Sequence, residues 1–273
     1  MRYLRIVTIL IFVAACALLG WTFYTLSSQD VVAPRIVDTV GELHLKVSDD
    51  AAMLLEGLSA TDDRAGDLTD RILIERTSRF SQPGVCQVSY VVFDNSENFC
   101  RYQRTVVYDD YVSPRLQLEQ PLMYQTGEQI TIMDRIRLYD SIDGDITHTL
   151  KLEASNVPAD TSGVYEIELS ATNNYGDSIY AKIPLNIGLY SADAPKIGLK
   201  EYLVYTKAGA NFDPLAYVES VQDREGQSIP LDQIKVISQV NLSKPGGGQI
   251  CYEVTDQRGV VGITCLIVIV EET

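Results

Sequence analysis

Hydrophobic side chains follow one another without interruption near the start of the chain. No charged residue lies between Arg5 and Asp30, and residues 6–26 are predominantly apolar. At about 1.5 Å per residue, a helix over this range crosses the roughly 30 Å hydrocarbon layer of a membrane. The pattern predicts a transmembrane signal-anchor over residues 6–26. Because basic residues precede it and an acidic chain follows, we expect residues 1–5 in the cytoplasm and the bulk outside the cell.

Two other interpretations of this segment stay open. A signal peptide cleaved near Ala15 and Ala17 would usually have a shorter apolar core than this one. A lipoprotein would carry its lipid on Cys16, because residues 13–16 (VAAC) resemble a lipobox, although mature lipoproteins usually turn polar directly after the cysteine. All three interpretations place residues 30–273 outside the cytoplasm.

After residue 30 the apolar residues follow a period of two. Three segments share one arrangement, in which a glycine is followed by an alternating run and then by an Asx residue that opens a turn. Alternation of this kind predicts a strand with one buried face, and the Asx turn predicts a hairpin. The arrangement joins Gly84 to Asp94, Gly163 to Asn173 and Gly246 to Asp256.

A second landmark returns with nearly the same spacing. A small residue, a proline, a basic residue and an aliphatic residue occur together at 33–36, 113–116 and 194–197. Proline suits the first residue of an edge strand, which need not donate to a ladder. The repeats predict an all-β chain of three tandem β-sandwich domains, joined end to end by short, stiff connectors. The expected domains are 33–110, 112–190 and 192–271.

Composition narrows the chemistry. The formal net charge is −15, whereas phosphate binding requires a basic face, so we expect no nucleic-acid partner. Only His44 and His148 are present, which leaves few groups for metal binding or for acid–base chemistry near neutral pH. P-loop, zincin and nucleophile-elbow motifs are absent from the sequence. We therefore predict that the protein is not an enzyme.

The first repeat, LSATDDRAGDLTDRILI followed by QPGVCQVSYVVFDNSENFCRYQRTVVY, resembles the bacterial surface immunoglobulin-like domains first described in a pesticidal crystal toxin. Those domains read approximately A-x-D-x-x-x-G-D-L-T, then P-G-x-Y-x-V-x-Y-x-V-x-D, then G-N and R-T-V. This chain departs at Glu97, where the family has glycine, and at Asn173, where it has aspartate. The resemblance implies three tandem immunoglobulin-like domains and an extracellular setting, but no single activity.

Closely spaced aspartates in two loops are candidate calcium ligands. Hard cations such as Ca²⁺ take six to eight oxygen ligands, and loop carboxylates can supply several of them. The simpler hypothesis is that an aspartate after glycine bonds backbone N–H groups and fixes a turn, in which case no cofactor is present. The candidates are Asp62, Asp63 and Asp67 in the first repeat and Asp140, Asp143 and Asp145 in the second.

Four cysteines beyond the N-terminal segment are disulfide candidates, because disulfides form outside the cytoplasm. Folding the third hairpin about residue 258 places Cys251 opposite Cys265, which predicts a bridge between facing strands. In the first repeat, Cys86 lies ~16 Å along the strand from the partner of Cys100, so a bridge there requires a bulge or a longer loop. The alternative for Cys86 is a buried free thiol.

Together these features favour a membrane-anchored extracellular stalk, adhesion or ligand-binding protein without catalytic activity. A structural partner in a cell-envelope assembly and a cadherin-like, calcium-dependent adhesion protein are the alternatives. The expected partners are the membrane, through the N-terminal helix, and a protein or glycan ligand at the surface.

Overall fold

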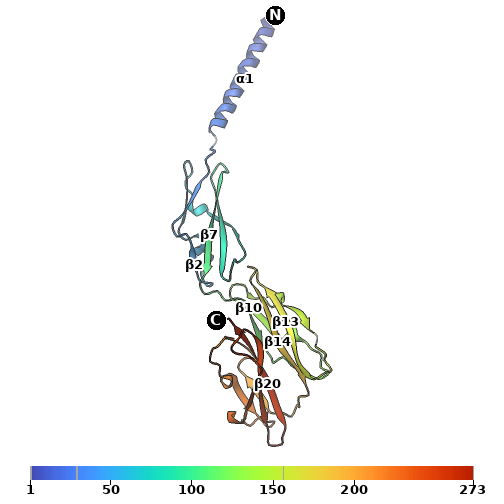
Figure 1. Ribbon diagram of the computed structural model, residues 1–273. Helices are drawn as coiled ribbons and strands as arrows, with labels where there is room; N and C mark the ends of the chain where they lie inside the picture. Colours follow the sequence, from blue (N-terminus) through green and yellow to red (C-terminus); the bar gives the residue numbers. More distant parts are fainter. Residues whose placement is uncertain (1, 29, 156, 273) are drawn as a thin grey trace. The chain divides into compact units, whose positions relative to one another are not determined.

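The N-terminal apolar run forms one long helix. The structure, a computed structural model, describes residues 2–28, 30–155 and 157–272, and α1 covers Arg2–Ser28 (Figure 1). The stretch Arg5–Thr25 within α1 is 21 residues long and has a hydropathy of 2.5. A helix of this length and composition can cross a membrane or serve as a signal sequence.

The described strands after α1 form three β-sandwiches, each with one small sheet and one four-stranded sheet, which confirms the predicted all-β fold (Figure 1). The first sandwich consists of sheets β1-β3-β4 and β2-β7-β6-β5. Its strands are β1 (Arg35–Asp38), β2 (Leu43–Leu45), β3 (Leu58–Asp62), β4 (Gly66–Asp67), β5 (Leu73–Thr77), β6 (Val85–Phe93) and β7 (Phe99–Tyr108).

The second sandwich consists of sheets β11-β10-β8 and β12-β13-β14-β9. Its strands are β8 (Arg115–Leu118), β9 (Met123–Gln125), β10 (Ile136–Asp140), β11 (Gly144–Asp145), β12 (Lys151–Ser155), β13 (Gly163–Thr172) and β14 (Ser178–Gly188). The third sandwich consists of sheets β15-β17 and β16-β20-β19-β18. Its strands are β15 (Lys196–Leu199), β16 (Leu203–Lys207), β17 (Val218–Gln222), β18 (Lys235–Ser238), β19 (Gly246–Thr255) and β20 (Val261–Glu271).

Helical structure after α1 is confined, in the described residues, to single short turns. These are α2 (Ile132–Arg135) and the 3₁₀ turns Ala51–Leu55, Thr69–Arg71, Thr147–Thr149, Pro214–Tyr217 and Leu231–Gln233.

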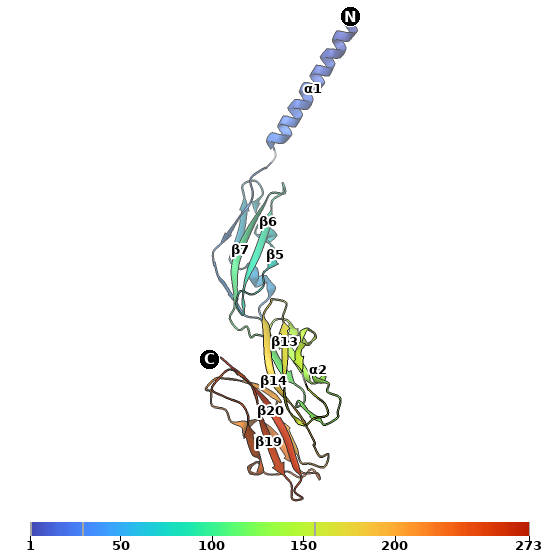
Figure 2. The same cartoon turned by 45° about the vertical axis from the view of Figure 1, so that its right-hand side comes forward.

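One long antiparallel hairpin lies at the centre of each sandwich, where the alternating segments predicted it: β6–β7, β13–β14 and β19–β20 (Figure 2). The Asx residue opens each turn as expected. Asp94 Oδ1 accepts the backbone N–H groups of Ser96 and Asn98, at 2.7 and 2.8 Å. Such bonds hold the turn because the side chain replaces a backbone acceptor.

The buried face of each hairpin matches the predicted alternation. Because successive side chains of a strand point to opposite faces, every second residue enters the core. The buried residues include Val88, Tyr90 and Val92 in the first sandwich, Ile167, Leu169 and Ala171 in the second, and Ile250, Tyr252 and Val254 in the third.

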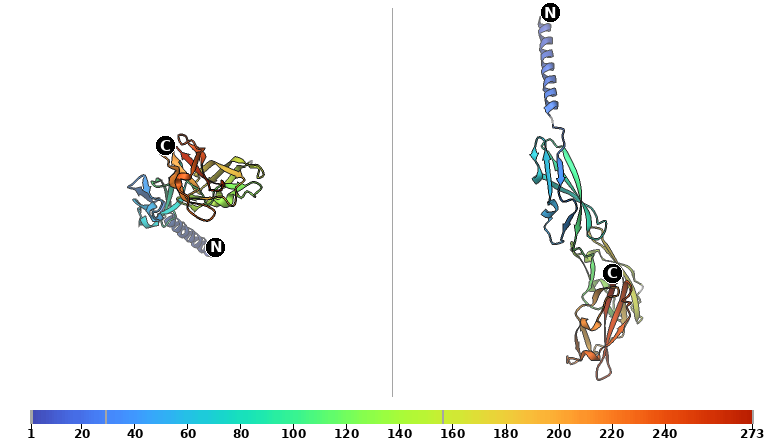
Figure 3. Two further views of the ribbon diagram at one scale, coloured as in Figure 1. Left: turned by 90° about the horizontal axis from the view of Figure 1, so that it is seen from below. Right: turned by 60° about the vertical axis from the view of Figure 1, so that its left-hand side comes forward.

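The three sandwiches form two compact units. Unit 1 comprises Met1–Ser78 and Val85–Asp109, and unit 2 comprises Arg79–Gly84 and Asp110–Thr273. Unit 2 therefore holds both the second and the third sandwich, and Leu203 and Ile267 of the third lie in the same apolar core as the second (Figures 2 and 3). The expected end-to-end joint between these two sandwiches is wrong, because they are fused along their sides.

Candidate functional site

Charged and aromatic side chains close one end of the seam between the two sandwiches of unit 2. Arg115, at the start of β8, donates from Nη2 to both carboxylate oxygens of Glu271, at the end of β20, at 3.0 Å each. The guanidinium lies 4.5 Å from the ring centroid of Tyr205, whose hydroxyl accepts the backbone N–H of Leu116 at 2.8 Å. The first strand of one sandwich thus meets the last strand of the other, which places them side by side.

Amide side chains join the two sandwiches further along the same seam. Asn186 on β14 and Gln249 on β19 exchange two hydrogen bonds, of 2.7 and 3.1 Å, and Gln249 is only 2% exposed. A Cβ added to Gly247 would lie 2.0 Å from the carbonyl oxygen of Lys182, far inside van der Waals contact. Only glycine permits this close approach of the backbones, so Gly247 has a structural role that no other residue can fill.

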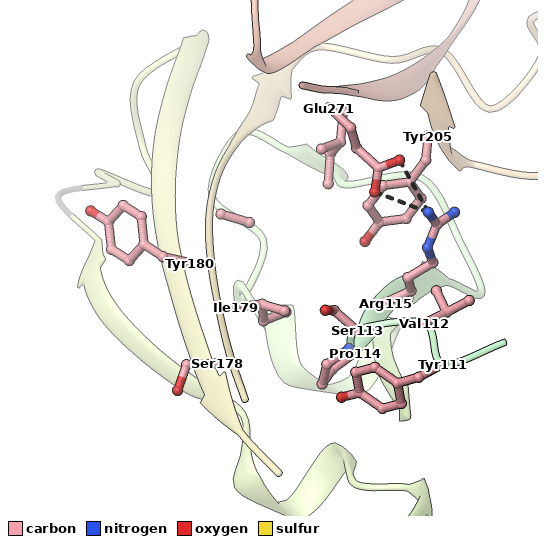
Figure 4. A pocket seen from close by; sticks show the side chains of 12 residues that line it. Tyr111, Val112, Ser113, Pro114, Arg115, Ser178, Ile179, Tyr180, Tyr205 and Glu271 are labelled. Carbon is pink, nitrogen blue, oxygen red and sulfur yellow. Dashed lines mark hydrogen bonds and ion pairs between the residues drawn. The ribbon is translucent and has the colours of Figure 1, made fainter. Parts of the chain in front are cut away.

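An open groove of about 550 Å³ runs beside the ion pair, with walls from both sandwiches of unit 2 (Figure 4). Arg115, Tyr205 and Glu271 lie together on one side of it, and Tyr111 lies near Pro114 on another. Burial raises the pKa of Tyr205 to about 12, so its phenol stays protonated at neutral pH and can only donate or accept hydrogen bonds. The groove therefore offers side chains that can hydrogen-bond a ligand. Tyr205 is one of them, and it cannot act as a base at neutral pH.

The groove is lined by Tyr111, Val112, Ser113, Pro114, Arg115, Ser178, Ile179, Tyr180, Ala181, Tyr205, Ile269 and Glu271.

Cys251 and Cys265 are joined in a disulfide, at the facing positions that the hairpin register predicted. Both cysteines point away from the core of their own sandwich, yet they are only 7% and 3% exposed. Alternation along β19 places Cys251 on the same side as Gln249, which contacts the second sandwich. The bridge therefore fastens together the two strands that carry the seam.

Cys86 and Cys100 are not bonded to each other. Cys100 pairs with Val92 in the hairpin, and Cys86 pairs with Val106, so no bulge brings the two thiols together. Cys86 is instead the buried free thiol of the alternative, and burial raises its pKa to about 11. Cys16, the lipidation candidate, lies exposed within α1.

Most of the predicted calcium ligands fix turns instead. Asp67 and Asp145 each accept the backbone N–H of the threonine two residues later, at 2.9 Å in both cases. Asp143 accepts the backbone N–H of Asn174 at 2.8 Å, and Asp63 is exposed. In the described residues, neither predicted set brings three of its own carboxylates close enough to share an ion.

Among the described residues, the group of three carboxylates close enough to share an ion is Asp30, Asp62 and Asp94. We call it the carboxylate cluster. Asp30 lies between α1 and β1, Asp62 ends β3, and Asp94 opens the β6–β7 turn. One oxygen of each lies within 4.8 Å of one oxygen of each of the others.

Hydrogen bonds fix the orientation of the cluster. Asp62 Oδ1 accepts the backbone N–H groups of Arg64 and Ala65, at 3.0 and 2.7 Å. Burial opposes the ionisation of Asp94, but hydrogen bonds from Asn98 and Ser96 outweigh it and hold the pKa of its carboxyl below the usual value. The Asn98 side chain also donates to the backbone oxygen of Asp30, at 3.0 Å.

Sequence reasoning found only Asp62 of this cluster, and it missed Arg115 and Glu271 of the seam. No spacing rule connects residues 30, 62 and 94, because they meet only when the sandwich closes. The threefold repeat contained a signal, since Asp94 stands where the second repeat has Asn173.

The pesticidal crystal protein Cry22Aa of Bacillus thuringiensis is 26% identical to this chain over 242 residues. The match covers 85% of this chain and 32% of that protein, so the chain spans about a third of the length of its curated relative. No family model matches the chain. The resemblance to Cry22Aa is therefore distant, and it extends over most of the sandwich region.

Two solved structures match most of this chain at low sequence identity and low TM-score. One contains the M60 catalytic domain with the CBM51-1 and CBM51-2 domains of ZmpB from Clostridium perfringens, with 11% identity and a TM-score of 0.26, and the match covers 89% of this chain and 31% of that one. The other is Drosophila N-cadherin EC1-4, with 11% identity and a TM-score of 0.22, and the match covers 88% of this chain and 75% of that one. At such TM-scores neither structure informs the function of this chain.

Proposed function

We propose that this protein is a non-catalytic surface protein of the bacterial immunoglobulin-like type, anchored in the membrane by α1. Unit 2 is its binding head, displayed outside the cytoplasm for adhesion to a protein or glycan ligand. The observation that carries the proposal is the combination of an apolar N-terminal helix with a disulfide in the last sandwich. Structural disulfides persist in oxidising compartments, which agrees with export of everything after α1.

The groove of unit 2 supports its role as the binding head. It combines an arginine, a glutamate and several tyrosines, and aromatic and arginine side chains are enriched where proteins bind partners. The shared core holds both walls of the groove in one compact unit, so a ligand would meet a preorganised surface.

Anchoring is tested with the full chain in expressing bacteria whose outer surface is exposed to protease. We expect the sandwich region to be digested from outside and, without protease, to stay in the membrane pellet after alkaline carbonate extraction. A variant with Ile11→Arg and Leu18→Arg should leave the pellet, because each arginine at mid-membrane costs about 2.5–3.5 kcal/mol on insertion scales. Two outcomes would contradict the anchor: removal of α1 from the wild-type protein with release of the remaining chain from the membrane, or complete protection of the sandwich region from protease.

Ligand binding is tested separately by probing protein and glycan arrays with the detergent-solubilised full chain. Tyr180 lines the groove and is 58% exposed, whereas Tyr139 is 41% exposed and lies outside the lining. We expect Tyr180→Ala to weaken saturable binding at least tenfold and Tyr139→Ala to leave it unchanged. Equal binding by both variants would exclude the groove as the ligand site.

A further inference from the structure

We propose that the carboxylate cluster of the first sandwich binds one hard divalent cation, for which calcium has the best-fitting chemistry. The ligands are Asp30, Asp62 and Asp94, so the site lies within unit 1 and is independent of the groove. Two observations carry the proposal: a buried carboxylate oxygen without a partner, and the contrast with the same place in the other two sandwiches.

The cluster buries negative charge that the protein compensates only in part. The side chain of Asp30 is 6% exposed and Asp94 is 4% exposed. Asp62 Oδ2 is fully buried and has no hydrogen-bond partner in the described part of the chain. Burying carboxylates close together is unfavourable unless a positive group compensates them.

Two arginines face the cluster from neighbouring elements. Arg64 Nε lies 3.9 Å from Asp30 Oδ2, beyond hydrogen-bond distance, and its side chain is 55% exposed. Arg71 contributes to the lowered pKa of Asp94, but its Nη1 is engaged with Asn95 at 2.8 Å. Neither guanidinium is within hydrogen-bond reach of the buried Asp62 Oδ2.

The second sandwich shows how the same place is satisfied without an ion. Asp140 corresponds to Asp62, since its Oδ1 also accepts the backbone N–H groups two and three residues later. Its Oδ2, however, accepts a hydrogen bond from the Asn173 amide at 2.9 Å, and it shares the Tyr111 hydroxyl, at 3.1 Å, with Asp177 Oδ2, at 2.8 Å. An amide and a shared phenol therefore face the carboxylate oxygen that corresponds to Asp62 Oδ2, which has no partner among the described residues of the first sandwich.

In the third sandwich, an arginine compensates the aspartate at the corresponding place. Asp256, which stands where the first sandwich has Asp94, accepts from Arg258 Nε at 2.8 Å and from Arg258 Nη2 at 2.6 Å. Arg258 also donates to the backbone oxygen of Asp193 at 2.9 Å, as Asn98 does to Asp30. The other two sandwiches thus supply donors at this place, whereas in the described residues of the first sandwich Asp62 Oδ2 has none.

The geometry and ligand type fit calcium. Calcium–oxygen distances are about 2.3–2.6 Å, so two ligands on opposite sides of the ion are ~5 Å apart. The oxygens of the cluster lie within 4.8 Å of one another, and they are carboxylates without histidine or thiolate, as hard cations prefer. Water would complete the shell, and calcium sites of extracellular modules typically have dissociation constants of about 10⁻⁴–10⁻³ M.

The test is calorimetric titration of calcium into the detergent-solubilised full chain after treatment with EGTA. We expect one ion per chain for the wild type and at least tenfold weaker binding for Asp62→Asn. Asp63→Asn removes the same charge from the exposed neighbouring aspartate, so it should bind like the wild type. No saturable binding up to about 10 mM, or equal binding by all three proteins, would overturn the proposal.

Thermal unfolding distinguishes loss of calcium binding from misfolding of the Asp62→Asn variant. In EGTA, Asp62→Asn should melt at or above the temperature of the wild type, because it removes a charge that the protein compensates only in part. In calcium, the wild type should gain several degrees and the variant should not. A variant that melts below the wild type in EGTA and still gains the same shift in calcium would show that the cluster binds no ion.

Discussion

At the scale of one residue, Glu97 replaces the glycine of the other two hairpin turns and strains the backbone there. It holds the fourth position of its hairpin turn, where the other two sandwiches have Gly176 and Gly259. All three residues adopt a left-handed backbone, with φ of 68°, 82° and 80°. Glycine adopts this region freely, whereas a residue with a Cβ is strained there by roughly 1 kcal/mol or more.

Replacing Glu97 with glycine should therefore stabilise unit 1. We expect Glu97→Gly to raise its free energy of unfolding by about 0.5–1 kcal/mol, after the greater flexibility of glycine in the unfolded chain is subtracted. The reverse change at the matching position, Gly259→Ala, should destabilise unit 2 by about 1 kcal/mol. Chemical denaturation followed by circular dichroism measures both, and a destabilised Glu97→Gly variant would show that the turn is not strained.

At the scale of the element, strand β7 carries a buried charge where its counterparts carry aliphatic side chains. Arg104 faces Val88 in the hairpin, as Ile183 faces Ile167 and Leu266 faces Ile250 in the other sandwiches. Its side chain is fully buried, and it donates to the backbone oxygens of Glu56 and Leu54. Its Nη1 lies 3.5 Å from Asp38, and its Nε has no hydrogen-bond partner among the described residues.

Asp38 needs this arginine as one of its compensating groups. Burial raises the pKa of its carboxyl, but backbone hydrogen bonds from Gly41 and Val40, together with Tyr102 and Arg104, outweigh burial and hold the pKa below its usual value. A lowered pKa contributes stability that is present above the unfolded value and is lost as the pH falls through the folded value.

Arg104→Ile should therefore cost unit 1 about 3–5 kcal/mol at pH 7, because it leaves Asp38 buried with less compensation. The loss should be smaller at acidic pH, below the lowered pKa of Asp38, where its carboxyl is protonated and no longer needs a compensating charge. Arg101→Ala on the same strand removes a more exposed ion pair with Glu75 and should cost under about 1 kcal/mol. Calorimetry of the unit 1 transition at both pH values measures these differences, and equal losses in the two variants would contradict the buried network.

At the scale of the whole molecule, the number of cooperative units differs from the number of sandwiches. Unit 2 should unfold in one calorimetric transition, because its two sandwiches share a core, and unit 1 should unfold in another. Gly247→Ala should divide the unit 2 transition into two, since any Cβ at this position collides with the Lys182 carbonyl. Gly259→Ala is the matched control, which should lower the unit 2 transition without dividing it. Three transitions in the wild type would contradict the shared core.

How far the sequence predicts this arrangement depends on whether a feature is local. Alternation around Tyr90, Leu169 and Tyr252 predicted the buried faces, and counting along one hairpin placed Cys251 opposite Cys265. The fused seam was missed, although a signal was present. Residues 265–270 (CLIVIV) are apolar at consecutive positions, which is typical of a strand buried on both faces.

Contacts between residues far apart in the sequence could not be predicted from the sequence. Arg115 and Glu271 are 156 positions apart, and no pattern in either neighbourhood indicates the other. Arg104 resembled an ordinary charged residue of a strand, because its acceptors at positions 54 and 56 come from a connecting segment with no recognisable motif. The carboxylate cluster was hidden for the same reason.

The pairing of Arg115 with Glu271 has a practical consequence for anyone who modifies this protein. The chain enters and leaves unit 2 at the same pole, so a reporter or purification handle fused behind Glu271 would crowd the groove that this glutamate lines. The turn Asp256–Val260 lies at the opposite end of β20, so a label attached to its exposed Gln257 side chain would stay clear of the groove.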